Sequence, residues 1–310
     1  MWKYPDHKDS EHLNYIRQSR LSSGGAMAGS LWTEVPTNQN EFYDGSHFIH
    51  ATRRRLGIVR VPEGSQCHMT DSGGVSTQRC DLNLDPYLTH PTTTCEKGTA
   101  KNRMHNFVRA GLAACLRAAG AEVDVERCIP DLSRVGENGQ IVDAIMDVVA
   151  VFPNATRQYW FDVTVRSPHA ARYNQVAAGA ASIPGHAAGE GCKDKWNKYG
   201  RDVIPIAVEP YGRISDHSVR CLEEVAINAA TLSDERWTSP NLLSSWLRRC
   251  QRLVVWAAAD LDLAALGKGA TKMEASIARG AMMRAIHKET RQGGGEGSEG
   301  RTASSTGGAG

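Results

Sequence analysis

Two aspartates stand inside apolar segments of the chain and could carry metal chemistry. Asp147 lies within residues 145–149 and Asp162 within residues 160–165, with fourteen residues between the two aspartates. A buried carboxylate is costly unless it is paired or binds a cation. If these segments form a hairpin, both carboxylates come level on neighbouring strands, where Mg²⁺ or Mn²⁺ could bind for phosphodiester hydrolysis.

Each aspartate also has a simpler interpretation. Either one could cap a turn or pair with an arginine, and Arg157 and Arg166 are the candidates in the sequence. Asp143 competes with Asp147 for the first position, but its spacing places it further from level with Asp162. Two carboxylates in register on apolar strands favour a metal over these alternatives.

Further polar residues could assist the acid pair. Lys195 and Lys198 are three residues apart in a predicted helix and share a face, and Tyr199 follows them. A lysine beside a metal can orient the attacking water or neutralise charge on the phosphate, although a solvated basic face also explains such lysines. His105 could approach the site and Glu126 could add a ligand, but a structural histidine and a solvated carboxylate are the simpler interpretations.

Three cysteines and a histidine occupy a polar, turn-rich stretch: Cys67, Cys80, His90 and Cys95. We expect an intracellular chain whose thiols stay reduced, so these cysteines need a role other than disulfides. Three cysteines and one histidine suit a closed tetrahedral zinc site. Twelve residues separate Cys67 from Cys80, which is a loose spacing for such a site.

The elements that must position these residues are predicted in the order helix, strand, strand, strand, helix, strand. The helices are expected at 103–119 and 187–199, and the strands at 123–125, 141–151, 158–165 and 203–209. Five regions follow: a flexible segment at 1–39, a helix and cysteine-rich segment at 40–100, an α/β core at 101–214, C-terminal helices at 215–290, and a disordered Gly/Ser tail at 291–310.

The composition narrows the function classes. Hydrophobic residues make up 41% and charged residues 23% of the 310 residues, which is typical of a globular protein. A net charge of +2 does not by itself indicate nucleic-acid binding, so any phosphate contact must come from local basic groups. No run of eighteen apolar residues is present, and we expect no membrane partner.

The predicted αβββαβ order resembles the restriction-enzyme-like, or PD-(D/E)XK, nuclease fold. More narrowly, the chain resembles the C-terminal endonuclease of non-LTR retrotransposon polyproteins. Asp147, Asp162 and the segment 195–199 match that family's motifs in order and spacing, and the spacing of His90 and Cys95 is similar to the second half of its zinc knuckle. The resemblance covers about residues 40–215 and implies a nuclear DNA endonuclease, with RNA as a second possible partner, detached from a longer polyprotein.

The chain departs from that family at three points. Met146 stands where a proline usually precedes the first aspartate, and Thr164 stands where a lysine is expected after the second. Cys67 and Cys80 replace a close cysteine pair. The resemblance implies that Lys195 takes over the lysine's role. Thr164 favours the alternative of a decayed nuclease that still binds nucleic acid, and a protein-interaction scaffold is a third interpretation.

Overall fold

The computed structural model describes the chain in ten stretches: residues 7–24, 45–58, 61–62, 64–70, 79–97, 100–136, 138–153, 155–173, 179–232 and 238–267. Contacts group residues Met1–Gly269 into one unit. The predicted tail at 291–310 lies outside the described residues.

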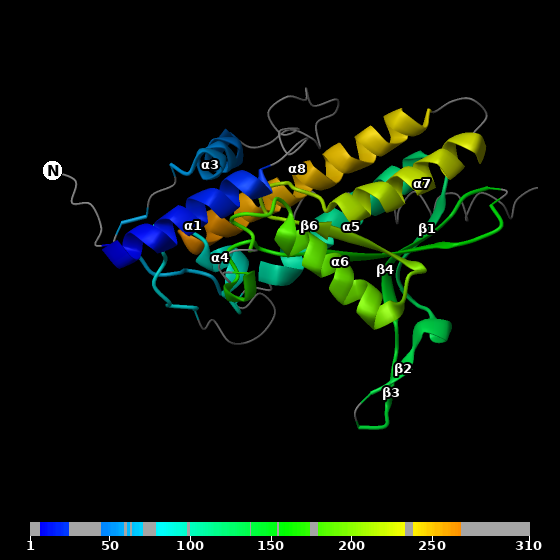
Figure 1. Cartoon of the computed structure of the whole chain (residues 1–310), viewed down its shortest axis with the longest axis horizontal. Helices are drawn as coiled ribbons and strands as arrows, with labels where there is room; N and C mark the ends of the chain where they lie inside the picture. Colours follow the sequence, from blue (N-terminus) through cyan, green and yellow to red (C-terminus); the bar gives the residue numbers. More distant parts are fainter. Residues whose placement is uncertain are drawn as a thin grey trace, which may run out of the picture. The chain divides into compact units, whose positions relative to one another are not determined.

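A four-stranded mixed sheet forms the centre of the fold (Figure 1). Its strands stand in the order β1 (Glu122–Cys128), β4 (Ile145–Val151), β5 (Tyr159–Val165) and β6 (Val203–Val208). The pairs β1–β4 and β4–β5 are antiparallel, and β5–β6 is parallel. The predicted mixed α/β class is confirmed, and the predicted hairpin is the β4–β5 pair.

Helices cover the sheet and one another. They are α5 (Ala100–Ala118), α6 (His186–Tyr199), α7 (Asp216–Leu232) and α8 (Ser239–Ala265), with short 3₁₀ turns at Pro130–Leu132 and Ala171–Tyr173. Helix α5 contacts β1, β4 and β5, whereas α6 contacts β5 and β6. In the part of the chain that the structure describes, no helix has the length and apolar content needed to cross a membrane.

Strand β5 has both faces buried, which explains its unbroken apolar sequence. Asp162 and Thr164 point toward α6, and a methyl group added at Gly191 of α6 would lie only 3.0 Å from Thr164 Cγ2. Gly191 therefore lets α6 lie close to the strand. Because successive side chains of a strand alternate, Phe161 points to the opposite face, where it is fully buried.

The predicted strand at 141–151 is interrupted in the structure. Residues Ile141–Val142 form β3, which pairs with β2 (Arg134–Val135) in a separate two-stranded ribbon that projects from the sheet (Figure 1). Val135 and Ile141 are 71% and 74% exposed, so their apolar character does not reflect burial. The chain rejoins the sheet at Ala144, whose carbonyl accepts the Ile129 N–H.

A buried ionic network joins α3 (Gly45–Leu56) to α8. His47 Nε2 lies 3.2 Å from Asp260, and both His50 Nε2 and Arg54 contact Asp262, at 3.2 and 2.5 Å. Arg103 of α5 contacts Asp260 at 2.8 Å. Since buried charges are stable only when they are paired, this network fixes three helices against one another.

The expectation of a flexible segment at 1–39 is wrong for residues His7–Ser23, which form helix α1. The buried side of α1 contains Ser19 and Ser23 beside Ile16, so its sequence lacks the apolar stripe that identifies a packed helix. Hydrogen bonds hold it instead: Tyr15 Oη donates to the Pro168 carbonyl at 2.6 Å.

Candidate functional site

The sheet brings the two predicted aspartates together. The β4–β5 ladder ends at the pair Val148–Phe161, and the same register continued by one residue sets Asp147 opposite Asp162. Beyond that point the ladder stops, and the Val163 N–H donates to Asp147 Oδ2 at 2.6 Å instead of to a backbone carbonyl. The Asp147 carboxylate thus occupies the fork between the two strands.

One cationic group from each flanking helix contacts the acid pair. His105 Nε2 of α5 lies 2.9 Å from Asp147 Oδ2, and Lys195 Nζ of α6 donates to Asp162 Oδ1 at 2.8 Å. The side chains of Lys195 and His105 are 19% and 26% exposed, so the site opens to solvent at its edge. The sequence favoured a structural role for His105, but the structure places this histidine in the site. Its place on the helix that packs beside the acids is the only feature that could have indicated this role.

The two carboxyl groups differ in acidity because their surroundings differ. Burial raises the pKa of Asp162 to about 6, with Asp147 adding to the rise and Lys195 opposing it. Burial also opposes ionisation of Asp147, but hydrogen bonds from His105 and the Val163 N–H lower its pKa below the ordinary value. Burial works against the charged form of His105, yet the contact with Asp147 raises its pKa overall.

The donor set at the acid pair fits a hard divalent cation. Asp162 is only 3% exposed, and its Oδ2 has no hydrogen-bond partner although it is buried. An orphaned carboxylate oxygen costs free energy unless another group binds it. Oxygen ligands are those that Mg²⁺ and Mn²⁺ prefer, so Asp147 and Asp162 could hold such an ion.

The remaining predicted residues lie elsewhere. Thr164 is buried on the α6 face of β5. Lys198 is exposed, with Nζ 4.4 Å from the centre of the Tyr199 ring, and Tyr199 packs against a hydrophobic cluster around Met146. Asp143 is exposed. The structure thus joins Lys195, and not Lys198 or Tyr199, to the acids.

The alternative arginine partners are also accounted for. Arg166 pairs with Asp194 of α6 at 3.0 Å. Arg157 lies over the Tyr159 ring, with its Cζ 4.8 Å from the ring centre. Among the described contacts neither arginine pairs with Asp147 or Asp162, so arginine pairing does not explain the buried acids.

The four predicted zinc ligands form a second cluster. The ligand atoms of Cys67, Cys80, His90 and Cys95 all lie within 4.8 Å of one another. Cys67 Sγ is 3.9 Å from Cys95 Sγ, and Cys80 Sγ is 3.3 Å from His90 Nε2. A tetrahedral zinc site with Zn–S bonds of about 2.3 Å has edges of about 3.8 Å, so this Cys₃His cluster could hold a metal such as zinc.

Local hydrogen bonds bring these ligands together. Bridges between Gln66 and Asn83 and between Thr70 and Arg79 join the two segments, with Cys67 hydrogen-bonded to Leu82 and Cys80 to Met69, which brings both cysteines close despite the twelve-residue gap. His90 begins the short helix α4 (His90–Thr93), and the Cys95 N–H donates back to the His90 carbonyl.

The histidine and a thiol of this cluster are prepared for a metal. His90 Nδ1 is 2.8 Å from Thr94 Oγ1, which leaves Nε2 directed at the sulfur atoms. The hydrogen bond from Cys67 lowers the pKa of Cys95. This contact favours the thiolate form of Cys95, which is the form that binds metal ions.

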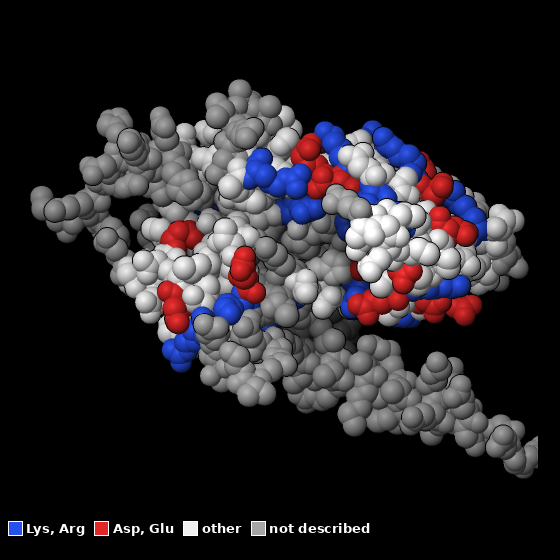
Figure 2. All heavy atoms as spheres, turned by 90° about the horizontal axis from the view of Figure 1, so that it is seen from below, with Lys and Arg blue, Asp and Glu red and all other residues white. Residues whose placement is uncertain are grey.

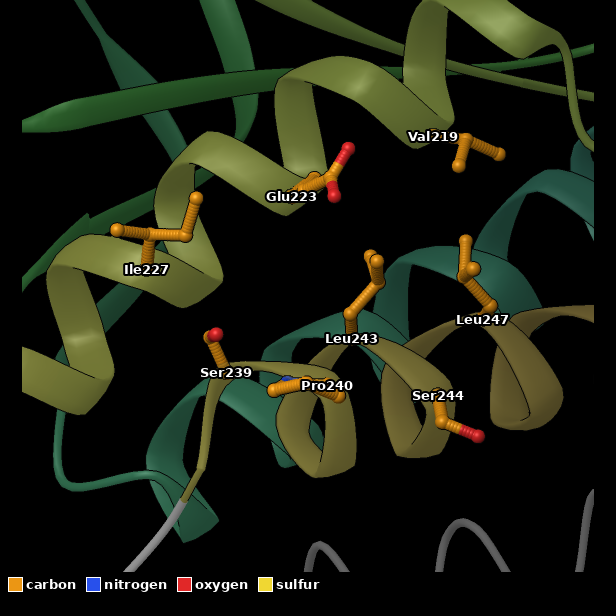
Figure 3. A pocket seen from close by; sticks show the side chains of 8 residues that line it. All are labelled: Val219, Glu223, Ile227, Ser239, Pro240, Leu243, Ser244 and Leu247. Atoms are coloured by element: carbon orange, nitrogen blue, oxygen red, sulfur yellow. The ribbon is translucent and has the colours of Figure 1, made fainter. Parts of the chain in front are cut away.

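Two other surface features do not form part of either site. A cavity of about 250 Å³ lies between α7 and α8, where Val219 and Ile227 face Leu243 (Figure 3). Its mainly apolar lining contains none of the predicted site residues. The face in Figure 2 mixes acidic and basic side chains, so no continuous basic surface appears on that face.

Comparison with known proteins adds no relative: no family model matches the chain, and neither the curated proteins nor the solved structures searched give a match.

Proposed function

We propose that this chain is a metal-dependent endonuclease with a restriction-endonuclease-like core, which hydrolyses phosphodiester bonds in DNA. The observation that carries the proposal is the convergence of Asp147, Asp162 and Lys195 at one point of the sheet, with Asp162 Oδ2 buried and unpartnered. The element order α5, β1, β4, β5, α6, β6 supports the same fold. A chromosomal target would require the protein to reach the nucleus.

The residues divide the work of hydrolysis. Asp147 and Asp162 would hold Mg²⁺ or Mn²⁺, which when bound supplies Lewis-acid stabilisation of the scissile phosphate and activates water. His105 and the Val163 N–H keep Asp147 ionised and fix its orientation. Lys195 provides a positive charge beside Asp162 that can orient a phosphate oxygen or the attacking water.

Lys195 supports activity despite the missing lysine at position 164. Thr164 and Asp162 lie on the same face of β5, and that face is covered by α6. Lys195 of α6 therefore approaches Asp162 from the face of β5 on which residue 164 lies. The ammonium group needed beside the acid pair is supplied from the helix instead of the strand.

The experiment uses the zinc-loaded full chain with supercoiled plasmid, in Mg²⁺, in Mn²⁺ and without either ion. Nicking that requires the divalent ion and is lost in Asp147→Asn and Asp162→Asn is the expected result. Asp143→Asn, which changes an exposed aspartate nearby, serves as the matched control. Cleavage that persists in Asp162→Asn would contradict the proposal.

A second candidate is a decayed nuclease that binds nucleic acid without cutting it. It is favoured by the cations that already neutralise the acid pair, because His105 and Lys195 occupy oxygens that a metal would otherwise bind. This candidate predicts DNA or RNA binding that weakens steeply with salt, in wild type and Asp162→Asn alike, with no cleavage.

A further inference from the structure

Glu126 of β1 stands beside the acid pair in an unusual backbone conformation. The β1–β4 ladder pairs Val125 with Val148 and Arg127 with Met146, so Glu126 lies level with Asp147. The pair Glu126–Asp147 is absent from that ladder, and Glu126 has a φ of +54°. A non-glycine residue with positive φ within a strand is strained, and such strain is often retained for function.

The register therefore sets three acidic residues side by side across three neighbouring strands. Glu126, Asp147 and Asp162 occupy matching positions on β1, β4 and β5. Opposed residues on adjacent strands of a regular ladder have Cα atoms about 5 Å apart. Among the described residues, the Cys₃His cluster is the one group of three or more ligands within 4.8 Å of one another, so Glu126 must turn away from Arg109 to reach an ion held by the two aspartates. Asp162 Oδ2, the buried oxygen without a hydrogen-bond partner on which the proposed function also rests, belongs to the same site.

Helix α5 connects Glu126 to this site as well. Arg109 forms an ion pair with Glu126, and His105, one helical turn earlier, contacts Asp147. Two side chains four residues apart on a helix lie on the same face, so they contact neighbouring positions on the sheet. The Glu126 side chain is 63% exposed, which leaves it free to turn from Arg109 toward a bound ion.

We propose that Glu126 is a third carboxylate ligand for the divalent cation held by Asp147 and Asp162, and that Arg109 holds it in the absence of the ion. This inference rests on the proposed function. It adds a ligand from β1 to the pair on β4 and β5. Metal binding then exchanges the Arg109 contact of Glu126 for a contact with the cation.

Titration of the zinc-loaded full chain with Mn²⁺, followed by the paramagnetic resonance signal of free Mn²⁺, tests the assignment. Glu126→Gln should weaken Mn²⁺ binding at least tenfold. Glu122→Gln removes an exposed carboxylate from the same strand and should bind Mn²⁺ as wild type does. Equal affinity of Glu126→Gln and wild type would overturn the inference.

A glycine substitution at position 126 distinguishes the effect of losing the carboxylate from the effect of the strained backbone. Glycine adopts positive φ without strain, so Glu126→Gly should keep the thermal midpoint at or above the wild-type value while losing the same Mn²⁺ affinity. Arg109→Gln alone should tighten Mn²⁺ binding. In a protein that already carries Glu126→Gln, the same substitution should change the Mn²⁺ affinity less. Wild-type affinity in Glu126→Gly would also overturn the inference.

The same titrations distinguish the two proposals. If wild type binds Mn²⁺ and Asp162→Asn does not, while Glu126→Gln is unaffected, the nuclease site stands and the role of Glu126 is wrong. If wild type and Asp162→Asn show the same lack of Mn²⁺ binding, the proposed metal site fails and the role of Glu126 fails with it.

Discussion

The Cys₃His cluster could hold a metal such as zinc, and the acid pair is the proposed site of a divalent cation. The two sites differ in the contacts that their ligand atoms make when no ion is bound. In the cluster the sulfur and nitrogen atoms lie against one another. In the acid pair the protein supplies its own cations, His105 and Lys195, and leaves one oxygen unpartnered. The first arrangement suits a permanent structural ion, and the second suits an ion that exchanges during a reaction.

The largest expected effect is loss of the metal from the Cys₃His cluster. Cys95→Ser should lower the free energy of unfolding by on the order of 5 kcal/mol, because binding of a structural zinc contributes directly to folding. Urea denaturation and zinc content measure this, with the exposed Cys128 changed to serine as control. If the Cys95→Ser protein keeps one zinc ion and its stability, the Cys₃His cluster is not a structural metal site and the proposed difference between the two sites is wrong.

Substitution in the acid pair should reduce activity without reducing stability. Asp162→Asn should reduce cleavage on the order of 10³-fold, since the charge that binds the cation is lost. Its free energy of unfolding should stay equal to wild type or rise, because a buried carboxylate becomes a neutral amide. Kinetic assays and denaturation of one sample measure both; a strongly destabilised Asp162→Asn would make this site structural too.

The stability of the acid pair should also depend on pH in a defined direction. Folding raises the pKa of Asp162 from 3.8 to about 6, so its contribution to stability is present below pH 3.8 and is lost as pH rises through 6. Without divalent ions, the stability gained by Asp162→Asn should therefore grow between pH 5 and 8, by about 1.4 kcal/mol. Urea denaturation of both proteins at several pH values checks this, and a constant difference would contradict the raised pKa.

The smallest expected effects on the cleavage rate concern the two lysines of α6, and the two substitutions should differ. Lys195→Ala should slow cleavage on the order of 10²-fold, because its ammonium group contacts Asp162. Lys198→Ala should change the rate less than about threefold, since an exposed lysine away from the reacting groups contributes little. Initial nicking rates at low salt measure both, and equal losses would mean that the basic face binds DNA as a whole.

The sequence predicted the parts of this structure that depend on local patterns. Alternation and apolar runs located the β4–β5 hairpin, and counting residues indicated that Asp147 and Asp162 would be level. Cysteine and histidine types identified the ligands of the second cluster, although the bridge between Gln66 and Asn83 that closes it leaves no signal in the spacing.

Other features depend on tertiary contacts that no local pattern records. Helix α1 packs through hydroxyl groups and its sequence therefore resembles a polar flexible segment. His105 and Asp147 are 42 positions apart in the sequence, and they meet only because α5 packs across the sheet. The ribbon of β2 and β3 carries exposed Ile141, although the apolar run from which the strand at 141–151 was predicted indicated burial.

The network between α3 and α8 has a consequence for the order of events during synthesis. His47 and Asp260 are 213 positions apart, so translation at about 5–20 residues per second separates their appearance by roughly 10–40 s. Until α8 leaves the ribosome, His47, His50 and Arg54 have none of their aspartate partners. We therefore expect the nascent chain to mature late, with α3 docking only after α8 has emerged.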